Sequence, residues 1–140
     1  PPVGLFAPRR GSRASRVNNN SVVLLLRHGD QRLLLTGDIE AEAETHLVAN
    51  GPLHPVTALK VPHHGSRTSS TAAFLDAIRP SVAVIQVGFA NRFGHPHPDV
   101  LDRLQGVGAR IFRTDRHGAV RLLLDGGSLA VVPTVDLAPE

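Results

Sequence analysis

Apolar residues occur in short, nearly continuous runs from Ser21 onward, and polar or Gly/Pro-rich segments separate these runs. Runs of this kind are typical of strands that are covered on both faces of a sheet. The first two runs are joined by a short turn at Gly29 and Asp30, which predicts a β-hairpin. Strands are expected at 21–28, 31–37, 57–62, 81–88, 110–115, 118–126 and 128–135.

Segments with helix signals lie between several of these runs. Helices are expected at 39–50, 70–79 and 99–106. Ser69 or Ser70 is the expected N-cap of the second helix, because serine side chains accept hydrogen bonds from free backbone N–H groups. His97 is the expected cap of the third helix, and Pro98 suits its first position. Strands and helices that alternate, with a hairpin first and antiparallel strands last, predict an α/β layer structure.

Composition limits both the organisation and the chemistry of the chain. Its 140 residues suffice for one domain or part of one. Residues 1–20 hold four Arg and three Pro and predict an irregular basic segment, followed by a folded unit at 21–134 and a tail at 135–140. The chain has no cysteine, so any metal must be held by His, Asp or Glu. No apolar run approaches the ~20 residues that span a bilayer, and no signal peptide is visible.

The net charge of +3 comes from an unusually Arg-rich set of basic residues. Lys60 is the only lysine among the fifteen basic residues. Arginine binds phosphate in a bidentate manner, which suits a nucleic-acid partner. Codon bias in a GC-rich genome is the other explanation for the same skew.

Chemically versatile side chains follow three successive predicted strands. LLLTGDIE places Asp38 where a strand meets a helix, and LKVPHHGSRTSS carries His63 and His64. FANRFGHPHP carries His95 and His97. Imidazole and carboxylate are together the ligands of zinc, manganese and iron hydrolases. Asp38 and His97 have an alternative role to metal binding, because each could instead be a helix cap.

The two histidine pairs have different expected geometries. Side chains of adjacent residues leave an extended backbone in opposite directions, so one of His63 and His64 would face the metal or phosphate and the other would orient it. The spacing of His95 and His97 would put both rings on one side. Phosphate contacts are expected at Ser66 and Arg67, ahead of a helix N-terminus, and at Asn91 and Arg92. The remaining histidines are expected to be exposed: His28, His46, His54 and His117.

The chain resembles the C-terminal half of the metallo-β-lactamase-fold domain of ComEC-type DNA internalisation proteins. Five segments carry the resemblance, in the order NNNS, LLLTGDIE, LKVPHHGSRTSS, NRFGHPHPDVLDRL and GARIFRTDRHGAVRL. The resemblance covers about residues 17 to 124. It implies an αββα sandwich whose C-terminal half is a mixed sheet with helices on one face. It also implies a metal-dependent nuclease, attached to a membrane channel, that degrades the non-transported DNA strand during natural transformation. The implied location is the bacterial inner membrane, with this domain on the extracytoplasmic side.

The resemblance assigns roles to individual residues. Asp38 matches an aspartate that bridges two metal ions, zinc or manganese, and His64, His95 and His97 are the further candidate ligands. His63 or His64 matches a histidine that contacts the scissile phosphate. The ligand motif HxHxDH of this fold is absent from the chain, and Asn18, Asn19, Asn20 and Ser21 stand where many relatives carry a histidine.

The chain therefore supplies half of the implied site. The expected partners are DNA, the N-terminal half of the domain and a membrane channel region. The isolated chain is expected to leave one sheet face uncovered and to show little nuclease activity. Two alternatives remain open: another hydrolase of the same fold acting on a small phosphodiester or a lactone, and a non-catalytic DNA-binding module.

Overall fold

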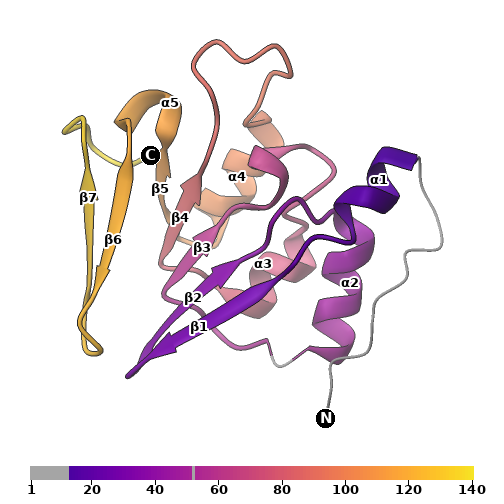
Figure 1. Cartoon of the computed structure of the whole chain (residues 1–140), viewed down its shortest axis with the longest axis horizontal. Coiled ribbons are helices and arrows are strands. Elements are labelled where there is room, and N and C mark those ends of the chain that lie inside the picture. Colours follow the sequence, from indigo (N-terminus) through magenta and orange to yellow (C-terminus); the bar gives the residue numbers. More distant parts are fainter. Residues whose placement is uncertain (1–12, 52) are drawn as a thin grey trace.

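The chain is built around a five-stranded sheet and a separate hairpin (Figure 1). The computed structural model describes residues 13–51 and 53–140. The sheet contains, in spatial order, β1 (Leu24–His28), β2 (Gln31–Leu35), β3 (Ala58–Lys60), β4 (Val82–Ile85) and β5 (Arg110–Arg113). The β1 strand runs antiparallel to β2, and β2 to β5 are parallel. The hairpin consists of β6 (Val120–Leu124) and β7 (Leu129–Pro133).

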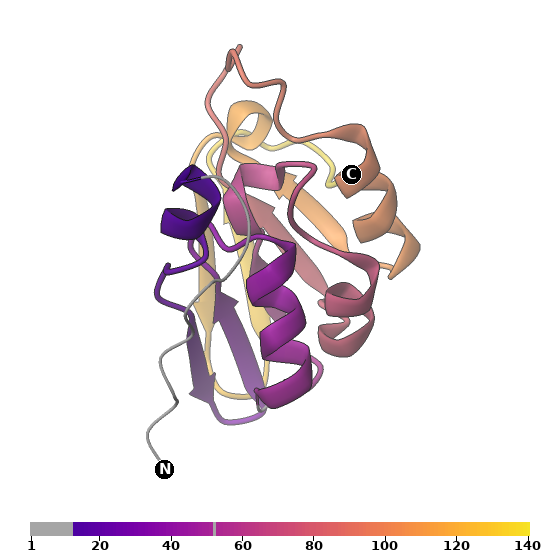
Figure 2. The same ribbon diagram turned by 90° about the vertical axis from the view of Figure 1, so that its right-hand side faces the viewer.

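The helices cover one face of the sheet and the hairpin covers part of the other (Figure 2). The helical elements are α1 (Arg13–Asn18), α2 (Ala41–Asn50), the 3-10 turn η1 (Pro62–Gly65), α3 (Ala72–Ile78), α4 (Pro98–Gly106) and α5 (Thr114–His117). None of the described helices is long and apolar enough to cross a membrane. The expected mixed sheet with helices on one face is confirmed.

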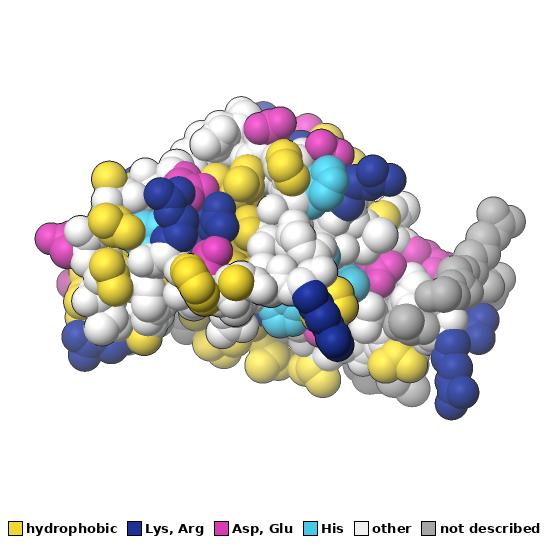
Figure 3. Space-filling model, turned by 90° about the horizontal axis from the view of Figure 1, so that it is seen from above, with side chains coloured by type: hydrophobic (Ala, Val, Ile, Leu, Met, Phe, Trp, Pro, Cys, Tyr) yellow, Lys and Arg dark blue, Asp and Glu magenta, His cyan; other side chains and the backbone are white. Residues whose placement is uncertain are grey.

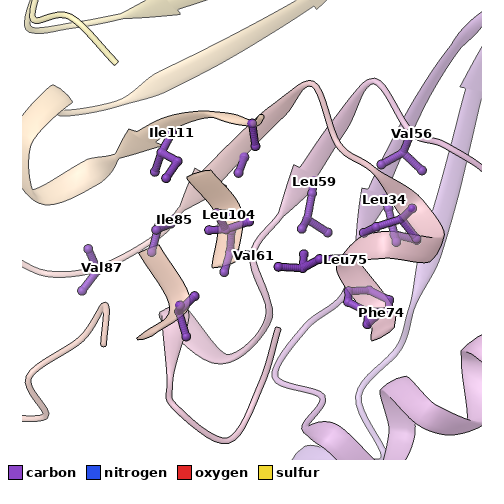
Figure 4. Packing of buried hydrophobic residues seen from close by; sticks show 14 residues of the cluster. Leu34, Val56, Leu59, Val61, Phe74, Leu75, Ile85, Val87, Leu104 and Ile111 are labelled. Atoms are coloured by element: carbon purple, nitrogen blue, oxygen red, sulfur yellow. The ribbon is translucent and has the colours of Figure 1, made fainter. Parts of the chain in front are cut away.

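Alternation along the strands explains the continuous apolar runs. In β4, Ala83 and Ile85 join the cluster under the helices, while Val82 and Val84 join the cluster under the hairpin. Both faces of this strand are buried, so every position is apolar. Figure 4 shows the larger cluster, to which the strands contribute Leu34, Leu59 and Ile85 and the helices contribute Phe74, Leu75 and Leu104.

The face opposite the helices is only partly covered. The hairpin packs over β2 to β5, contrary to the expectation that this face would lie bare. The side chains of Leu24 and Leu26 on β1 remain 48% and 49% exposed. The covering hairpin comes from this chain's own last two strands, which sequence reasoning placed only as antiparallel neighbours.

Two local predictions are corrected by the structure. Part of the segment expected to be irregular forms α1, while residues 1–12 lie outside the described residues. The N-cap of α3 is Thr71, whose hydroxyl accepts a hydrogen bond from the Phe74 N–H, and not Ser69 or Ser70. Ser69 is instead buried, with its hydroxyl directed to the carbonyl oxygens of preceding residues.

The C-terminal segment 135–140 is attached to the sheet. The backbone groups of Ile111 and Glu140 exchange two hydrogen bonds of 3.0 Å each. The carboxylate of Glu140 also approaches Arg113 to 3.5 Å. The predicted tail therefore extends the sheet edge beside β5.

Candidate functional site

The loops that follow β2, β3 and β4 meet at one edge of the sheet (Figure 1). Parallel strands place their carboxyl ends at the same edge, and ligand sites of α/β sheets commonly lie there. Asp38 follows β2, η1 carries His63 and His64 after β3, and the loop 86–97 after β4 carries His95 and His97. The predicted site residues are thus brought to one side of the molecule.

A glycine contact holds the two histidine loops together. Gly65 has φ +79°, and a Cβ atom at this position would lie 2.7 Å from the Cβ atom of Pro96. The carbonyl oxygen of Gly65 accepts a hydrogen bond of 2.8 Å from the His97 N–H. Only glycine fits this conformation and this close approach without strain.

His63 and His64 do not lie on an extended backbone, so the prediction that their side chains diverge from a strand is wrong. Their backbone angles are φ 47°, ψ 41° and φ 55°, ψ 22°, both in the left-handed region. Such conformations cost on the order of 1–3 kcal/mol for a residue other than glycine, and they cluster at functional sites. The two ring centroids are 6.4 Å apart.

The carboxylate of Asp38 is available for chemistry because the residue is not a helix cap. The N-cap of α2 is Glu40, and its side chain makes no capping hydrogen bond. The backbone N–H of Asp38 donates to the Ser21 hydroxyl at 3.0 Å, which anchors the turn against the segment before β1. The side chain of Asp38 is 40% exposed.

Asp38 and His64 form the central pair. The Nε2 atom of His64 lies 3.6 Å from Oδ1 of Asp38. The Nδ1 atom of His64 lies 2.6 Å from the carbonyl oxygen of Gln86, which can only accept, so the ring proton belongs on Nδ1. With Nδ1 bonded to Gln86, Nε2 is the ring nitrogen that faces the Asp38 carboxylate. Adjacent ligands of a tetrahedral zinc ion are about 3.4 Å apart, and metal-binding histidines commonly donate their other N–H to a carbonyl.

Glu40 connects His63 to α1, a connection that sequence reasoning missed. Oε1 of Glu40 lies 3.5 Å from the buried Nδ1 of His63 and accepts a hydrogen bond of 2.9 Å from Asn18. Oε2 accepts a hydrogen bond of 2.6 Å from the Ser15 hydroxyl. The Glu40 carboxylate thus fixes the helix beside the ring of His63. The only sequence signal was the acidic residue two positions after Asp38.

Lys60 is a second site residue that was missed. Its ammonium group donates to the Gly37 carbonyl oxygen at 2.7 Å and lies 3.6 Å from Oδ1 of Asp38. Burial lowers the pKa of Lys60, and the Asp38 carboxylate opposes this effect. A lone lysine in an Arg-rich chain, on the strand before the histidine pair, was the available signal.

His95 and His97 have different surroundings. Nδ1 of His97 accepts a hydrogen bond of 3.2 Å from the Asp99 N–H and caps α4, as the competing prediction had it. The ring centroid of His95 lies 6.0 Å from that of His63. Burial lowers the pKa of His95, as do the nearby rings of His63, His64 and His97, so its neutral form is favoured. A neutral imidazole is the form that binds metal.

The donor set fits part of the coordination sphere of one cation. Asp38 and His64 have the separation of neighbouring ligands, and His95, whose ring centroid lies 6.0 Å from that of His63, is a further candidate. Within 13–51 and 53–140, no three His, Asp or Glu side chains converge closely enough to hold a metal ion. Because the Lys60 ammonium already lies beside Oδ1 of Asp38, these residues give no support for two cations bridged by that carboxylate.

The four predicted phosphate contacts fall into two groups. Ser66 is buried, with its hydroxyl 3.1 Å from that of Thr68, and the Asn91 amide holds its own loop. Arg67 and Arg92 are exposed. Figure 3 shows histidine, basic and hydrophobic side chains on this side of the molecule. We retain the two arginines as candidate phosphate contacts.

His117 is buried, and the prediction that it is exposed is wrong. Its side chain accepts from the Arg113 N–H at 3.0 Å through Nδ1 and lies 3.2 Å from the Ala138 carbonyl oxygen through Nε2. The ring also packs edge-on against Phe112 at 5.4 Å. The segment 135–140 covers this residue, and nothing in the local sequence marks that contact.

The fold and the strand-end residues define an α/β protein with a histidine–carboxylate site at the carboxyl edge of a mixed sheet. The chain belongs to the Metallo-beta-lactamase superfamily, whose family model matches residues 17–88. The matched range includes Asp38, His63 and His64 and ends before His95 and His97.

Three bacterial proteins of known name resemble the chain. ComE operon protein 3 of Bacillus subtilis (strain 168) is 36% identical over 134 residues, 94% of this chain and 17% of that protein. Competence protein ComA of Neisseria gonorrhoeae is 39% identical over 114 residues, 80% of this chain and 16% of that protein. Recombination protein 2 of Haemophilus influenzae is 37% identical over 105 residues, 75% of this chain and 13% of that protein.

These similarities confirm the resemblance to ComEC-type competence proteins. The chain spans at most about a sixth of the length of these relatives, whose C-terminal part it matches.

Proposed function

We propose that this chain is part of a metal-dependent nuclease domain of a DNA uptake protein and that the domain degrades the non-transported strand. The observation that carries the proposal is the pair formed by Asp38 and His64, with Nε2 of His64 3.6 Å from Oδ1 of Asp38 and its other nitrogen bonded to Gln86. The names of two relatives, a competence protein and a recombination protein, support a role in the handling of DNA.

Asp38, His64 and His95 are the proposed contributors to one zinc or manganese site. When bound, such an ion acts as a Lewis acid and lowers the pKa of bound water to about 7. The carbonyl oxygen of Gln86 binds the Nδ1 side of His64 and orients the ring, and Nε2 is the proposed ligand atom. The remaining ligands would come from a part of the protein beyond this chain.

The other charged groups position the phosphodiester. The Lys60 ammonium offsets the negative charge of Asp38 and presents a fixed positive charge at the same edge. His63, held beside Glu40, is the proposed contact to the scissile phosphate and the donor of a proton to the leaving oxygen. Arg67 and Arg92 would bind neighbouring phosphates. The proposed location is the extracytoplasmic side of the bacterial inner membrane, where incoming DNA is met.

The test is hydrolysis of linear DNA by the natural-length protein with manganese or zinc. We expect His64→Ala and Asp38→Ala to lose metal-dependent hydrolysis and bound metal together, because both residues are proposed ligands. His54→Ala is the matched control, since His54 is exposed and lies outside the strand-end loops. Wild-type hydrolysis by Asp38→Ala contradicts the proposal. Rapid turnover of a small phosphodiester or lactone without turnover of DNA would favour another hydrolase of this superfamily.

A further inference from the structure

The loop 86–97 carries two phenylalanine side chains that protrude into solvent. Phe89 is 87% exposed and Phe93 is 67% exposed, whereas Phe74 and Phe112 are buried in the two core clusters. Single exposed apolar residues are common in proteins. Two large rings four residues apart on one loop, beside a candidate site, indicate a binding surface.

The loop is held in shape by specific hydrogen bonds. Oδ1 of Asn91 accepts from the backbone N–H groups of Phe93 and His95 at 3.2 and 3.0 Å, and its amide donates to the His95 carbonyl oxygen at 2.7 Å. At the base of the loop, the Thr114 hydroxyl bonds both the N–H and the carbonyl oxygen of Val87 at 2.8 Å. The two phenyl rings are therefore presented on an ordered support, which reduces the entropy lost on binding.

A series of planar side chains extends from Phe93 toward the candidate site. The guanidinium carbon of Arg92 lies 5.1 Å from the centroid of the Phe93 ring. The ring of His95 stacks against Phe93, with centroids 5.9 Å apart and planes inclined by 21°. The His95 ring also meets the His63 ring edge-on, with centroids 6.0 Å apart. The rings of Phe93 and His95, with the Arg92 guanidinium over Phe93, therefore lead from the loop to His63.

We propose that Phe89 and Phe93 form a stacking surface for unpaired nucleic-acid bases, with Arg92 binding the adjacent phosphate. The proposal rests on the proposed function and names its substrate as a single strand. Aromatic rings stack on bases of any sequence when the base faces are free, and a duplex keeps those faces covered. A base over Phe93 would place its strand in line with His95 and His63, where the phosphodiester is expected.

Charge favours a nucleic acid over an uncharged apolar partner. Arg92 lies directly against Phe93, and Arg67 is exposed on the loop that follows the histidine pair. A partner that buried Phe93 through apolar contact alone would have to desolvate the neighbouring guanidinium. A phosphate beside a base makes use of both groups.

The test compares substitutions that keep or remove the aromatic face. The natural-length protein, in EDTA so that metal-dependent hydrolysis is prevented, is titrated with fluorescein-labelled oligothymidine and with a labelled duplex of the same length. Phe93→Leu keeps an apolar side chain without an aromatic face, and Phe93→Trp keeps the face. We expect Phe93→Leu and Phe89→Leu to weaken single-strand binding about 5- to 150-fold each, while the Trp variants bind like wild type.

The controls separate this proposal from its alternatives. Leu123→Ala removes a side chain that is 53% exposed on β6 and should leave binding unchanged. Unchanged single-strand binding by Phe93→Leu overturns the proposal, and so does an equal loss for single strand and duplex. Binding to vesicles of phosphatidylcholine and phosphatidylglycerol tests a lipid surface as the partner. If the Leu variants of Phe89 and Phe93 keep vesicle binding and the corresponding Ala variants lose it, the rings belong to a lipid surface and the proposal is overturned.

The proposed nuclease activity can fail without this inference failing. If Asp38→Ala hydrolyses DNA like wild type while Phe93→Leu still weakens single-strand binding in EDTA, the metal assignment is wrong and the stacking surface stands. If Asp38→Ala abolishes hydrolysis and Phe93→Leu binds normally, only the stacking surface is rejected.

Discussion

Histidines follow strands at two corners of this molecule, and their surroundings are opposite. At the β5–α5 corner, both ring nitrogens of His117 have partners within the chain, and the side chain is 1% exposed. At the carboxyl ends of β2 to β4, His63 and His64 are partly exposed on a strained backbone. One corner uses imidazole as a buried structural group, and the other leaves two imidazole rings partly exposed.

The difference lies in how the hydrogen-bonding capacity of each ring is used. A buried polar group must find partners when the chain folds, because an unpaired one costs about 1–3 kcal/mol. His117 meets that requirement with backbone atoms of Arg113 and Ala138. His64 uses one nitrogen for the Gln86 carbonyl oxygen and leaves the other toward Asp38. The two histidines thus differ in their partners, since backbone atoms surround the His117 ring whereas a partly exposed carboxylate faces Nε2 of His64.

The largest expected effect concerns His63. In the natural-length protein, His63→Ala should lower metal-dependent DNA hydrolysis by roughly 10²–10⁴-fold, the usual contribution of a general acid. Bound metal, measured by mass spectrometry of the purified protein, should stay at the wild-type level, because His63 faces Glu40. Parallel loss of metal and activity would instead make His63 a ligand. His54→Ala serves as the control for histidine removal.

The second effect is on stability, at the other corner. His117→Ala should lower the free energy of unfolding by about 2–4 kcal/mol, because it leaves buried backbone groups unpaired and creates a cavity beside Phe112. Urea denaturation monitored by circular dichroism measures this quantity. His54→Ala should change it by less than about 0.5 kcal/mol. Equal stabilities for the two variants would show that His117 is not a structural residue.

The smallest effect is a pH dependence carried by a buried acid. The carboxylate of Glu44 accepts hydrogen bonds of 2.5 and 2.8 Å from the N–H groups of Ser70 and Thr71. Burial nevertheless raises the pKa of Glu44 above 4.5, so the folded state holds this proton more tightly than the unfolded state does. The contribution of Glu44 to stability is therefore greatest below pH 4.5 and falls as the pH rises through the folded-state pKa.

Urea denaturation of wild type and Glu44→Gln between about pH 4 and pH 7 tests this sign. The variant should be less stable overall, because its amide offers one acceptor oxygen to two N–H groups. The variant should also lose the decrease in stability with rising pH that Glu44 causes in the wild type. An unchanged pH profile in Glu44→Gln would assign that dependence to other groups.

The strands were the most predictable part of the molecule. Apolar runs and the Gly29–Asp30 turn predict the β1–β2 hairpin, which the register Leu25 to Leu34 confirms. The fold class also followed from the order of elements. Local patterns carry this information because side-chain alternation and turn chemistry act over a few residues.

The site was predictable in its residue types and not in its contacts. Asp38, His63, His64 and His95 were predicted as site residues because they follow successive predicted strands, and the structure brings these strand ends to one edge. The link between Glu40 and α1 and the burial of His117 under 135–140 both depend on residues more than twenty positions apart. Such contacts arise from tertiary packing, which local sequence patterns do not report.

The outer edge of β1 has a consequence for handling the protein. In the described part of the chain this strand has a neighbour on one side only. Leu24 and Leu26 in the strand are 48% and 49% exposed, and Val22 just before it is 73% exposed. An apolar strand with unpaired backbone groups is a template on which another copy can add. Only the charge of Arg27 opposes such addition. Self-association that grows with protein concentration is therefore the intrinsic hazard of this chain when it is purified alone.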